Sequence, residues 1–235
     1  RDLLGRITNI HETLDGVAIA KTYQYDLAGQ LVVAITNGVG SGASTYAYDA
    51  NGNRTNWLVD GVAGWAVYDE QDRLLQFVNG NITNTYQYTA AGNLTNKTAG
   101  ADVTGYTYDG AGSLMAVSLP DGRAIAYRVD GYGRRVAKYV DGVFNRGFIY
   151  GNGLLPIAEL DAQSNVVSQF VYADGNGAPL YMIRTGAVYR VITDQLGSPR
   201  LMLEASTGEI AQRLDYDEWG RITSDSAPGF QPFGF

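Results

Sequence analysis

Short stretches in which apolar and polar residues alternate, separated by turn residues, run along the whole chain. In one of them Tyr23 and Tyr25 lie two residues apart, and the alternation resumes at Leu31 after Asp26 and Gly29. Residues two apart point to the same face of a strand, so this stretch predicts two strands joined by a turn. Asp at the first turn position accepts backbone N–H bonds two residues on, and Gly at the fourth tolerates a positive φ. Asp-x-x-Gly therefore predicts a type I turn closed by a glycine bulge.

The unit Tyr-Asp-x-x-Gly recurs at a nearly constant spacing. Complete copies begin at Tyr25, Tyr48, Tyr108 and Tyr216, and paired tyrosines return at Tyr46 and Tyr48, Tyr86 and Tyr88, and Tyr106 and Tyr108. In the middle of the chain the Asp position is held by Asp49, Asp69, Thr89, Asp109 and Asp130, which are 20, 20, 20 and 21 residues apart. Such a period indicates a repeat protein whose units stack because none can bury its apolar face alone. The first copy, Asp2 to Gly5, lacks the preceding tyrosine, which predicts a chain that begins inside a repeat.

A second set of turns lies roughly midway between the first. These are the dipeptides Asp60-Gly61, Asn79-Gly80, Asp121-Gly122 and Asp141-Gly142. Asn-Gly and Asp-Gly are strong signals for two-residue hairpin loops, because both central residues of a type I′ turn need a positive φ. Turns about every ten residues leave strands of roughly five to seven residues. The chain is therefore predicted to be one long antiparallel meander.

The predicted fold class is all-β. Glycine is abundant, and no window of eleven or more residues keeps a helical period without one. A meander of this length must twist and curl into a barrel, a propeller or a continuous spiral wall. Propeller blades need about 40 residues and four strands per repeat. Because the repeat here is a two-stranded hairpin, a continuous curling sheet is favoured.

Some copies depart from the pattern at a single position. Asp72 stands where the turn glycine is expected, Thr89 replaces the turn aspartate, and Val129 replaces the tyrosine. Asp is among the non-glycine residues that most readily adopt the left-handed region, so the hairpins are expected to persist, and Asp72→Gly is expected to be neutral or stabilising. Positions that vary singly behave as scaffold positions rather than as catalytic ones.

Composition excludes several classes of protein. Apolar residues make up 45% of the chain, as in a folded globular protein. The net charge is −7, and Lys occurs only at Lys21, Lys97 and Lys138, so no nucleic-acid partner is expected. There is no cysteine, which excludes disulfides, thiolate zinc sites and cysteine nucleophiles. No apolar run approaches 18 residues and no signal peptide is visible, so no membrane span is expected.

The tyrosines are the distinctive component of the predicted strands. Tyr occurs 17 times and Phe 7 times, so much of the aromatic area carries a polar tip. We expect one face of the sheet to pack at the rings and to be wet or hydrogen-bonded at the hydroxyls. We interpret the doublet Arg134-Arg135 as the end of one hairpin turn.

Few residues are candidates for chemistry. His11 is the only histidine, so a Ser-His-Asp triad is excluded except around it, a His-rich metal site is impossible, and an ordinary strand or loop histidine is expected. Asp215 and Asp217 lie on one face of a strand, and further carboxylates lie close by at Glu204, Glu209 and Glu218. Paired carboxylates serve glycosidases and Ca²⁺ sites, but no EF-hand spacing accompanies these, and Asp217 is already explained as a turn residue.

Other motifs have simpler explanations. The Asn-x-Ser/Thr sequons are at Asn53, Asn81, Asn93 and Asn96, and Asn53 and Asn93 lie where the repeat itself prefers Asn. The Gly-Asn-Gly sequences at 151–153 and 175–177 are predicted to be turns rather than phosphate loops, because no helix follows either. We therefore predict no catalytic residue, no cofactor-binding residue, no metal ligand and no cofactor.

The copies Tyr-x-Tyr-Asp-x-x-Gly-Asn/Gln/Arg-Leu resemble the YD repeats of the Rhs family. Thr193–Arg200 resembles the opening of the Rhs repeat-associated core, and this likeness continues through Tyr216–Arg221 and Pro232–Phe235. The likeness covers almost the whole chain, least clearly between residues 150 and 190. It implies YD/Rhs repeats over residues 1–190 and a truncated start of the Rhs repeat-associated core over 191–235.

The resemblance implies a spiral YD-repeat β-shell that encloses a hollow chamber. In bacterial Rhs proteins and in the C components of Tc toxins this chamber holds a variable C-terminal toxin domain, and in teneurins related shells form part of an adhesion ectodomain. The bacterial members end their core in an aspartic self-cleaving segment, which is not found in this sequence. No catalytic residue can therefore be transferred by match.

Three functions follow as expectations. The first is a structural, non-enzymatic wall segment of a bacterial polymorphic toxin, with the flanking repeats of the same polypeptide and an encapsulated C-terminal toxin domain as partners. The second is an extracellular recognition protein, teneurin-like or cell-wall-associated, that binds carbohydrate or a cell-surface protein. An enzyme in its own right is the third. The expected location is secreted, at the cell surface, or exported by a delivery system.

Overall fold

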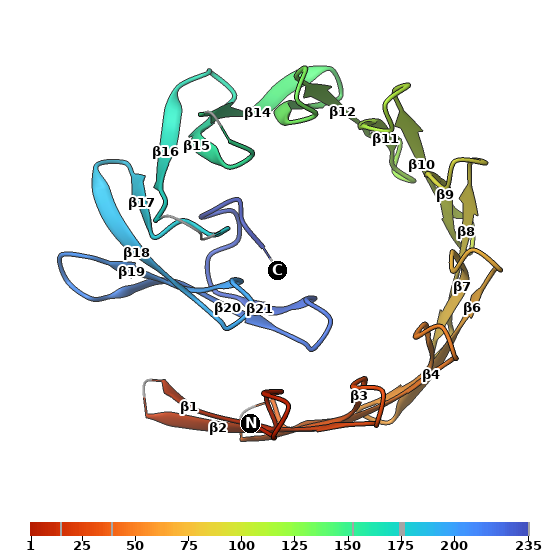
Figure 1. Cartoon of the computed structure of the whole chain (residues 1–235). Helices are drawn as coiled ribbons and strands as arrows, with labels where there is room; N and C mark the ends of the chain where they lie inside the picture. The colour runs from red at the N-terminus through yellow and green to blue at the C-terminus, as the bar shows by residue number, and fades with distance from the viewer. Residues whose placement is uncertain (15, 39, 152, 174–176, 235) are drawn as a thin grey trace. The chain divides into compact units, whose positions relative to one another are not determined.

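The described residues contain only β-strands, loops and turns. The computed structural model describes residues 1–14, 16–38, 40–151, 153–173 and 177–234. They form 21 strands, and there is no helix among them (Figure 1). The prediction of an all-β protein is confirmed.

The chain divides into two compact units, which are described separately. Unit 1 comprises Arg1–Thr107 with Ser118–Asp121, and unit 2 comprises Tyr108–Val117 with Gly122–Phe235. The strands that begin in unit 1 are β1 (Asn9–Leu14), β2 (Val17–Tyr25), β3 (Leu31–Gly38), β4 (Gly42–Tyr48), β5 (Arg54–Val59), β6 (Val62–Tyr68), β7 (Leu74–Asn79), β8 (Ile82–Tyr88), β9 (Leu94–Ala99) and β10 (Asp102–Tyr108). Those that begin in unit 2 are β11 (Leu114–Ser118), β12 (Ala124–Val129), β13 (Arg135–Val140), β14 (Val143–Tyr150), β15 (Pro156–Leu160), β16 (Val166–Val171), β17 (Tyr181–Arg184), β18 (Ala187–Thr193), β19 (Pro199–Glu204), β20 (Ile210–Tyr216) and β21 (Ile222–Asp225).

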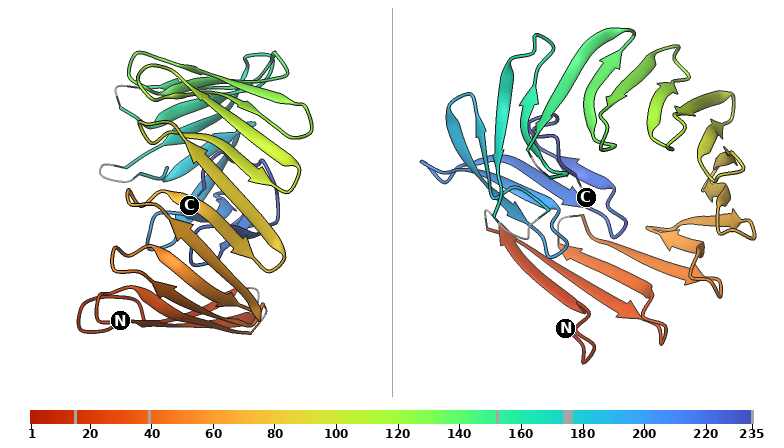
Figure 2. Two further views of the ribbon diagram at one scale, coloured as in Figure 1. Left: turned by 90° about the vertical axis from the view of Figure 1, so that its right-hand side faces the viewer. Right: turned by 45° about the horizontal axis from the view of Figure 1, so that its top comes forward.

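Within each unit, successive strands pair antiparallel, as a meander requires. Successive strands pair from β1 through β10, and again from β12 through β21. The hairpins of unit 1 lie side by side along its sheet (Figure 2). A continuous meander of hairpins is therefore observed in both units.

The Asp-x-x-Gly turns have the predicted geometry. In the turn at Asp49, the Gly52 N–H donates to the Asp49 carbonyl at 3.2 Å and the Asp49 N–H donates to the Asn53 carbonyl at 3.0 Å. Gly52 has a φ of 91°, and Asp72 adopts 59° at the same position of its turn. A bulge follows, because Tyr48 lies opposite Arg54 while Ala47 lies opposite Asn56. This is a type I turn closed by a bulge.

The two-residue loops agree with prediction in part. Asp60 and Gly61 have φ values of 48° and 82°, and Asp141 and Gly142 have 50° and 80°, as a type I′ turn requires. The expectation for Asn79-Gly80 is wrong by one residue. Asn79 is the last residue of β7, where it pairs with Ile82, so the loop is Gly80–Asn81. Only Gly80 has a positive φ, 57°, which is the type II′ pattern.

The expectation for Asp121-Gly122 is also wrong. Strand β11 ends at Ser118 and β12 begins at Ala124, so the loop is longer than two residues. Only Gly122 has a positive φ, 88°. Pro120 has a φ fixed near −65°, which suits the second position of a type I turn and places Gly122 at its fourth.

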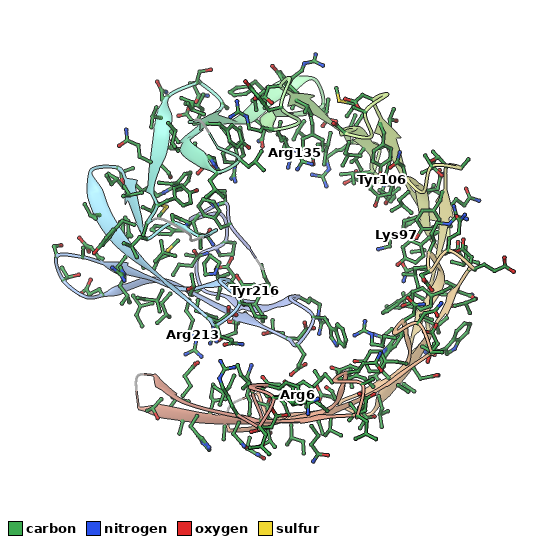
Figure 3. All side chains as sticks on the ribbon, in the orientation of Figure 1. Arg6, Lys97, Tyr106, Arg135, Arg213 and Tyr216 are labelled. Atoms are coloured by element: carbon green, nitrogen blue, oxygen red, sulfur yellow. The ribbon has the colours of Figure 1, made fainter. Side chains whose placement is uncertain are left out.

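One face of the unit 1 sheet is the packed face. Its core cluster contains Ala34, Tyr46, Trp57 and Ala66, with the partly buried Tyr23, Leu31, Tyr48, Val59, Tyr68, Leu74 and Phe77 against it. Cross-strand partners share a face of a sheet, and Tyr46 lies opposite Trp57 just as Tyr23 lies opposite Ala34. Figure 3 shows Lys97 and Tyr106 on the concave side of the curved unit 1 sheet, and Lys97 pairs with Tyr86 at the equivalent position. The packed face is therefore the concave face.

Unit 2 has a second core under its C-terminal segment. Phe170, Met182, Val191 and Met202 form the buried cluster, and Phe230 and Phe233 pack against it. The ring of Phe233 meets that of Phe170 edge-on at 4.7 Å, and the Phe230 ring meets that of Tyr189 at 5.0 Å. The segment after β21 thus folds back over strands β16–β19 of its own unit.

Candidate functional site

The turn aspartate is a cap for the backbone of its own hairpin. The Asp49 Oδ1 atom accepts the N–H groups of Asn51 and Asn53, both at 2.9 Å, and Oδ2 accepts the Asn53 side-chain amide at 3.0 Å. The Asn53 side chain and these amides hold the pKa of the Asp49 carboxyl below its usual value, because each bond favours the charged form. A carboxylate that is saturated in this way serves the turn and is not available for catalysis.

An arginine just after the turn connects one repeat to the next. The Arg134 Nε donates to Asp130 Oδ2 at 2.7 Å, and its Nη1 donates to the carbonyls of Gly151 and Gly153 at 3.0 Å. The same guanidinium lies 4.9 Å from the ring centroid of Tyr150. Arg6 and Arg73 occupy the same place in their hairpins, with Nε to carboxylate distances of 2.6 Å. Sequence analysis missed this role, although the signal was visible as Asp-x-x-Gly-Arg or Asp-x-x-Asp-Arg.

The tyrosine before the turn aspartate is tied to the preceding repeat. The Tyr48 hydroxyl donates to the Leu31 carbonyl at 2.7 Å, and the Tyr88 hydroxyl donates to the Leu74 carbonyl at 2.8 Å. In each pair the acceptor lies two residues after the end of the preceding four-residue turn, as Leu31 does after the turn Asp26–Gly29. The same bond is made by Tyr25 to Ile7, Tyr68 to Arg54, Tyr150 to Arg135, and Tyr216 to Pro199. We call these bonds tyrosine straps.

The straps explain the preference for Tyr over Phe. Burial raises the pKa of Tyr48 to about 12, because the buried ring disfavours the phenolate. Burial likewise raises the pKa of Tyr172 to about 12, and the Tyr172 hydroxyl donates to the Pro156 carbonyl at 2.9 Å. The hydroxyls remain protonated donors over the physiological range. The prediction that the rings pack and the hydroxyls bond is confirmed at these positions. Among the described residues, the Tyr108 hydroxyl makes no such bond.

Asp72 connects its turn to the preceding turn, and replacement by Gly would remove this connection. Its Oδ1 accepts the side-chain amides of Asn51 at 2.9 Å and Asn53 at 2.7 Å. Both donors come from the preceding Asp-x-x-Gly turn. The sequence alone predicts that Asp72→Gly is neutral or stabilising. That expectation does not take into account these two hydrogen bonds between neighbouring turns.

The candidate catalytic residues are not assembled into a site. His11 is exposed on β1, opposite Ala20. Asp215 binds Arg200 at 2.7 Å and Arg213 at 2.9 Å, so two guanidiniums already neutralise it. Asp217 caps its turn through the N–H groups of Trp219 and Arg221.

The remaining candidates belong to turns and surface strands. Glu204 accepts the hydroxyls of Ser206 and Thr207, which lie in its own hairpin. The side-chain amide of Asn53 is bound to two carboxylates, as described above. The turns expected at 151–153 and 175–177 each include residues outside the described ranges, at 152 and at 175–176.

Metal and membrane features are not found in the described part of the chain. No group of His, Cys, Asp or Glu there has the proximity that a metal ion requires. Nor do the described residues contain a helix that is long and apolar enough to cross a membrane.

The geometry defines the class of protein. The chain is a β-protein built from hairpin repeats, in which tyrosine hydroxyls and arginines tie each hairpin to its neighbour. The family model that matches is the teneurin YD-shell, over residues 1–235. The chain belongs to this family. The resemblance to YD-repeat and Rhs proteins is confirmed.

The chain is similar to both animal and bacterial proteins. Human Teneurin-1 is 30% identical over 98% of the chain. Double-stranded DNA deaminase toxin A of Burkholderia cenocepacia is 28% identical over 90% of the chain, and toxin protein Tse5 of Pseudomonas aeruginosa is 26% identical over 100% of it. The chain covers 8%, 16% and 22% of these relatives, respectively. A Tc holotoxin pore of Photorhabdus luminescens matches 96% of the chain and 18% of its own, with 13% identity and a TM-score of 0.46.

Proposed function

We propose that this chain is a structural wall segment of an Rhs/YD-repeat shell that encapsulates a C-terminal toxin domain of the same polypeptide and helps to deliver it. The carrying observation is the run of tyrosine straps along the packed face of unit 1. A wall that shields a passenger must keep its strands from separating, and each strap ties a strand to the preceding hairpin. The two bacterial relatives that are named as toxins support the same assignment.

The proposal includes the organisation, chemistry and location of the chain. Residues 1–190 are repeats, and residues 191–235 begin the Rhs repeat-associated core. The segment is not an enzyme and uses no cofactor or metal, which agrees with the engagement of Asp215 and Asp217 in structural contacts. The protein is secreted, displayed at the surface of a bacterium, or exported by a delivery system. Its partners are the flanking repeats and the enclosed toxin domain.

Limited proteolysis of the natural polypeptide that contains this chain tests the proposal. Residues of the passenger should resist trypsin until urea unfolds the hairpins, and should then be cut quickly. The matched control is the passenger expressed alone, which should be cut without urea. Equal cutting rates for the free and the carried passenger in buffer would exclude encapsulation.

A second candidate function is recognition of carbohydrate or a cell-surface protein outside the cell. It is favoured by the match to Teneurin-1 and by apolar side chains on the convex face of unit 1. Trp65 is 40% exposed, and Leu58 and Val67 are similarly exposed on the same face. A glycan array would test it, with Trp65→Ala as the variant that should lose any signal.

A further inference from the structure

Strand β13 differs from the unit 1 strands that follow an Asp-x-x-Gly-type turn. In the unit 1 hairpins β2–β3 and β6–β7, two residues of the strand after the turn face the concave side and belong to the core: the second and the fifth residue after the fourth turn position. Such pairs are Leu31 with Ala34 and Leu74 with Phe77 in the unit 1 core. In β13 the same two positions hold Arg135 and Lys138. Two other hairpins have a cation at only one of the two positions. One pair is Arg54 with Trp57, and the other is Leu94 with Lys97.

The cations of β13 and β14 share one face of unit 2. Lys138 lies opposite Tyr127 on one side and opposite Arg146 on the other, and cross-strand partners share a face. The Arg135 guanidinium lies 3.8 Å from the ring centroid of Tyr127, so it is on that face too. Figure 3 shows Arg135 pointing to the concave side of unit 2. We call Arg135, Lys138 and Arg146 the cationic patch.

The carboxylates of the adjacent hairpins are already engaged. Asp130 binds Arg134 at 2.7 Å, and Asp141 accepts the N–H of Ala124 at 2.7 Å. Glu159 binds Arg146 at 3.0 Å. Within the described part of the chain, neither Arg135 nor Lys138 forms an ion pair. The patch therefore lacks counter-charges, although the whole chain carries a net charge of −7. Because like charges held close together repel each other, an added negative charge is favourable here.

We propose that the cationic patch binds the carboxylate side chains of an extended acidic polypeptide segment. Arginine offers a fork that fits a carboxylate, and lysine offers a point charge beside it. The ring of Tyr127 supports Arg135 from below, which leaves the edges of its guanidinium for a ligand. The inference rests on the proposed function only in assigning this segment to the enclosed passenger.

A protein segment fits the patch better than a nucleic acid does. Nucleic-acid binding needs a basic stripe that follows a phosphate backbone. Here the turns at the two ends of β13 carry Asp130 and Asp141, which would repel a continuous polyanion. Separate carboxylates on flexible side chains can reach Arg135 and Lys138 and avoid both turns.

Peptide titration tests the inference directly. A fluorescein-labelled oligoglutamate peptide should bind the chain in low salt and dissociate as salt is added, whereas an oligoglutamine peptide should not bind. The double variant Arg135→Gln, Lys138→Gln should lower the affinity about tenfold, since two ion pairs to the peptide are lost. The matched control is Arg128→Gln. Arg128 stacks on Tyr139 at 5.6 Å and pairs with Ala137, on the opposite face of the same hairpin, so its loss should leave the affinity unchanged.

Crosslinking locates the bound peptide. A carbodiimide joins a peptide carboxylate to a lysine amine as an amide and carries the displaced oxygen away as a urea. Mass spectrometry should find the amide mainly at Lys138, with Lys21 and Lys97 as internal controls. Equal crosslinking of all three, unchanged affinity of the double variant, or tighter binding of a DNA duplex than of oligoglutamate would each overturn the inference. If the double variant loses peptide binding but still protects the passenger from trypsin, the proposed function stands. The assignment of the acidic segment to the passenger is then wrong.

Discussion

Replacing Tyr48 by Phe isolates the contribution of one tyrosine strap. The substitution removes the hydroxyl that donates to the Leu31 carbonyl at 2.7 Å. The ring remains and keeps its packing against the core cluster around Tyr46 and Trp57. Any loss of stability can therefore be assigned to the hydrogen bond.

The expected cost is about 1 kcal/mol. A neutral hydrogen bond contributes roughly 0.5–1.5 kcal/mol net, because folding exchanges bonds to water for internal ones. The strap is part-buried, so water replaces the lost donor only in part. In a domain of this size, 1 kcal/mol lowers the midpoint of thermal unfolding by about 2–4 °C.

Urea unfolding and hydrogen exchange measure the effect. Tyr132→Phe is the matched control, because Tyr132 is 80% exposed and its hydroxyl makes no hydrogen bond among the described residues. The control should change the free energy of unfolding by less than about 0.5 kcal/mol. In Tyr48→Phe the amides of β3 and β4 should exchange faster, since the strap joins these two strands.

The pH dependence adds an independent check. Burial raises the pKa of Tyr48 to about 12 in the folded protein, above the ordinary value of 10.0 for a tyrosine. The folded state therefore holds this proton more tightly than the unfolded state. The stabilisation of the folded state by the protonated Tyr48 hydroxyl is fully present below about pH 10 and is lost as the pH rises towards 12. Tyr48→Phe should lose less stability than the parent over this window. Indistinguishable urea midpoints for Tyr48→Phe and Tyr132→Phe, together with the same alkaline profile as the parent, would refute the reasoning.

Further predictions concern the turns and the termini. Gly112→Val should cost on the order of 1–2 kcal/mol in a thermal melt, because Gly112 has a φ of 85° and a β-branched residue there is strained. Asp72→Gly should cost up to about 1 kcal/mol, since two hydrogen bonds exceed the relief of a positive φ; a stabilised variant would contradict this. Mass spectrometry should detect no scission within the chain on standing. Hydrogen exchange should be fast at residues 1–6, where Leu3 and Leu4 are exposed, and slower near Phe230, which packs in a core cluster.

The local structure followed from the sequence at most of the turns that require a positive φ, but not at Asn79-Gly80 or Asp121-Gly122. A positive φ was required at the glycine of Asp-x-x-Gly and at both residues of Asp60-Gly61, and the structure has it at these positions. Asn79-Gly80 was misplaced because Gly80 alone also suits the first position of a type II′ loop. The dipeptide does not distinguish the two loops. The register of the flanking strands does, and it places Asn79 opposite Ile82.

The contacts between repeats were not predictable in the same way. That Tyr48 needs a hydrogen-bond acceptor follows from its chemistry, but the acceptor is a backbone carbonyl 17 residues earlier. Its identity depends on how tightly one hairpin lies against the next. The packing of Phe230 and Phe233 against Tyr189 and Phe170 depends on the path of the C-terminal segment, which no periodicity in residues 226–234 reveals.

The eroded hairpin at Thr89 shows why single copies can lose their motif. Thr89 keeps one cap, because its hydroxyl accepts the N–H of Asn93 at 3.1 Å. It has no carboxylate to bind an arginine, but Arg73 of the preceding turn lies 5.5 Å from the ring of Tyr88 and 3.5 Å from the Thr89 carbonyl. The Tyr88 hydroxyl in turn binds Leu74. A weak copy is therefore held by its neighbour, as expected when stability comes from the interfaces between repeats. It follows that Arg73→Gln should weaken the hairpin at Thr89 more than Thr89→Ala does. The opposite order of urea midpoints would mean that each turn stabilises itself alone.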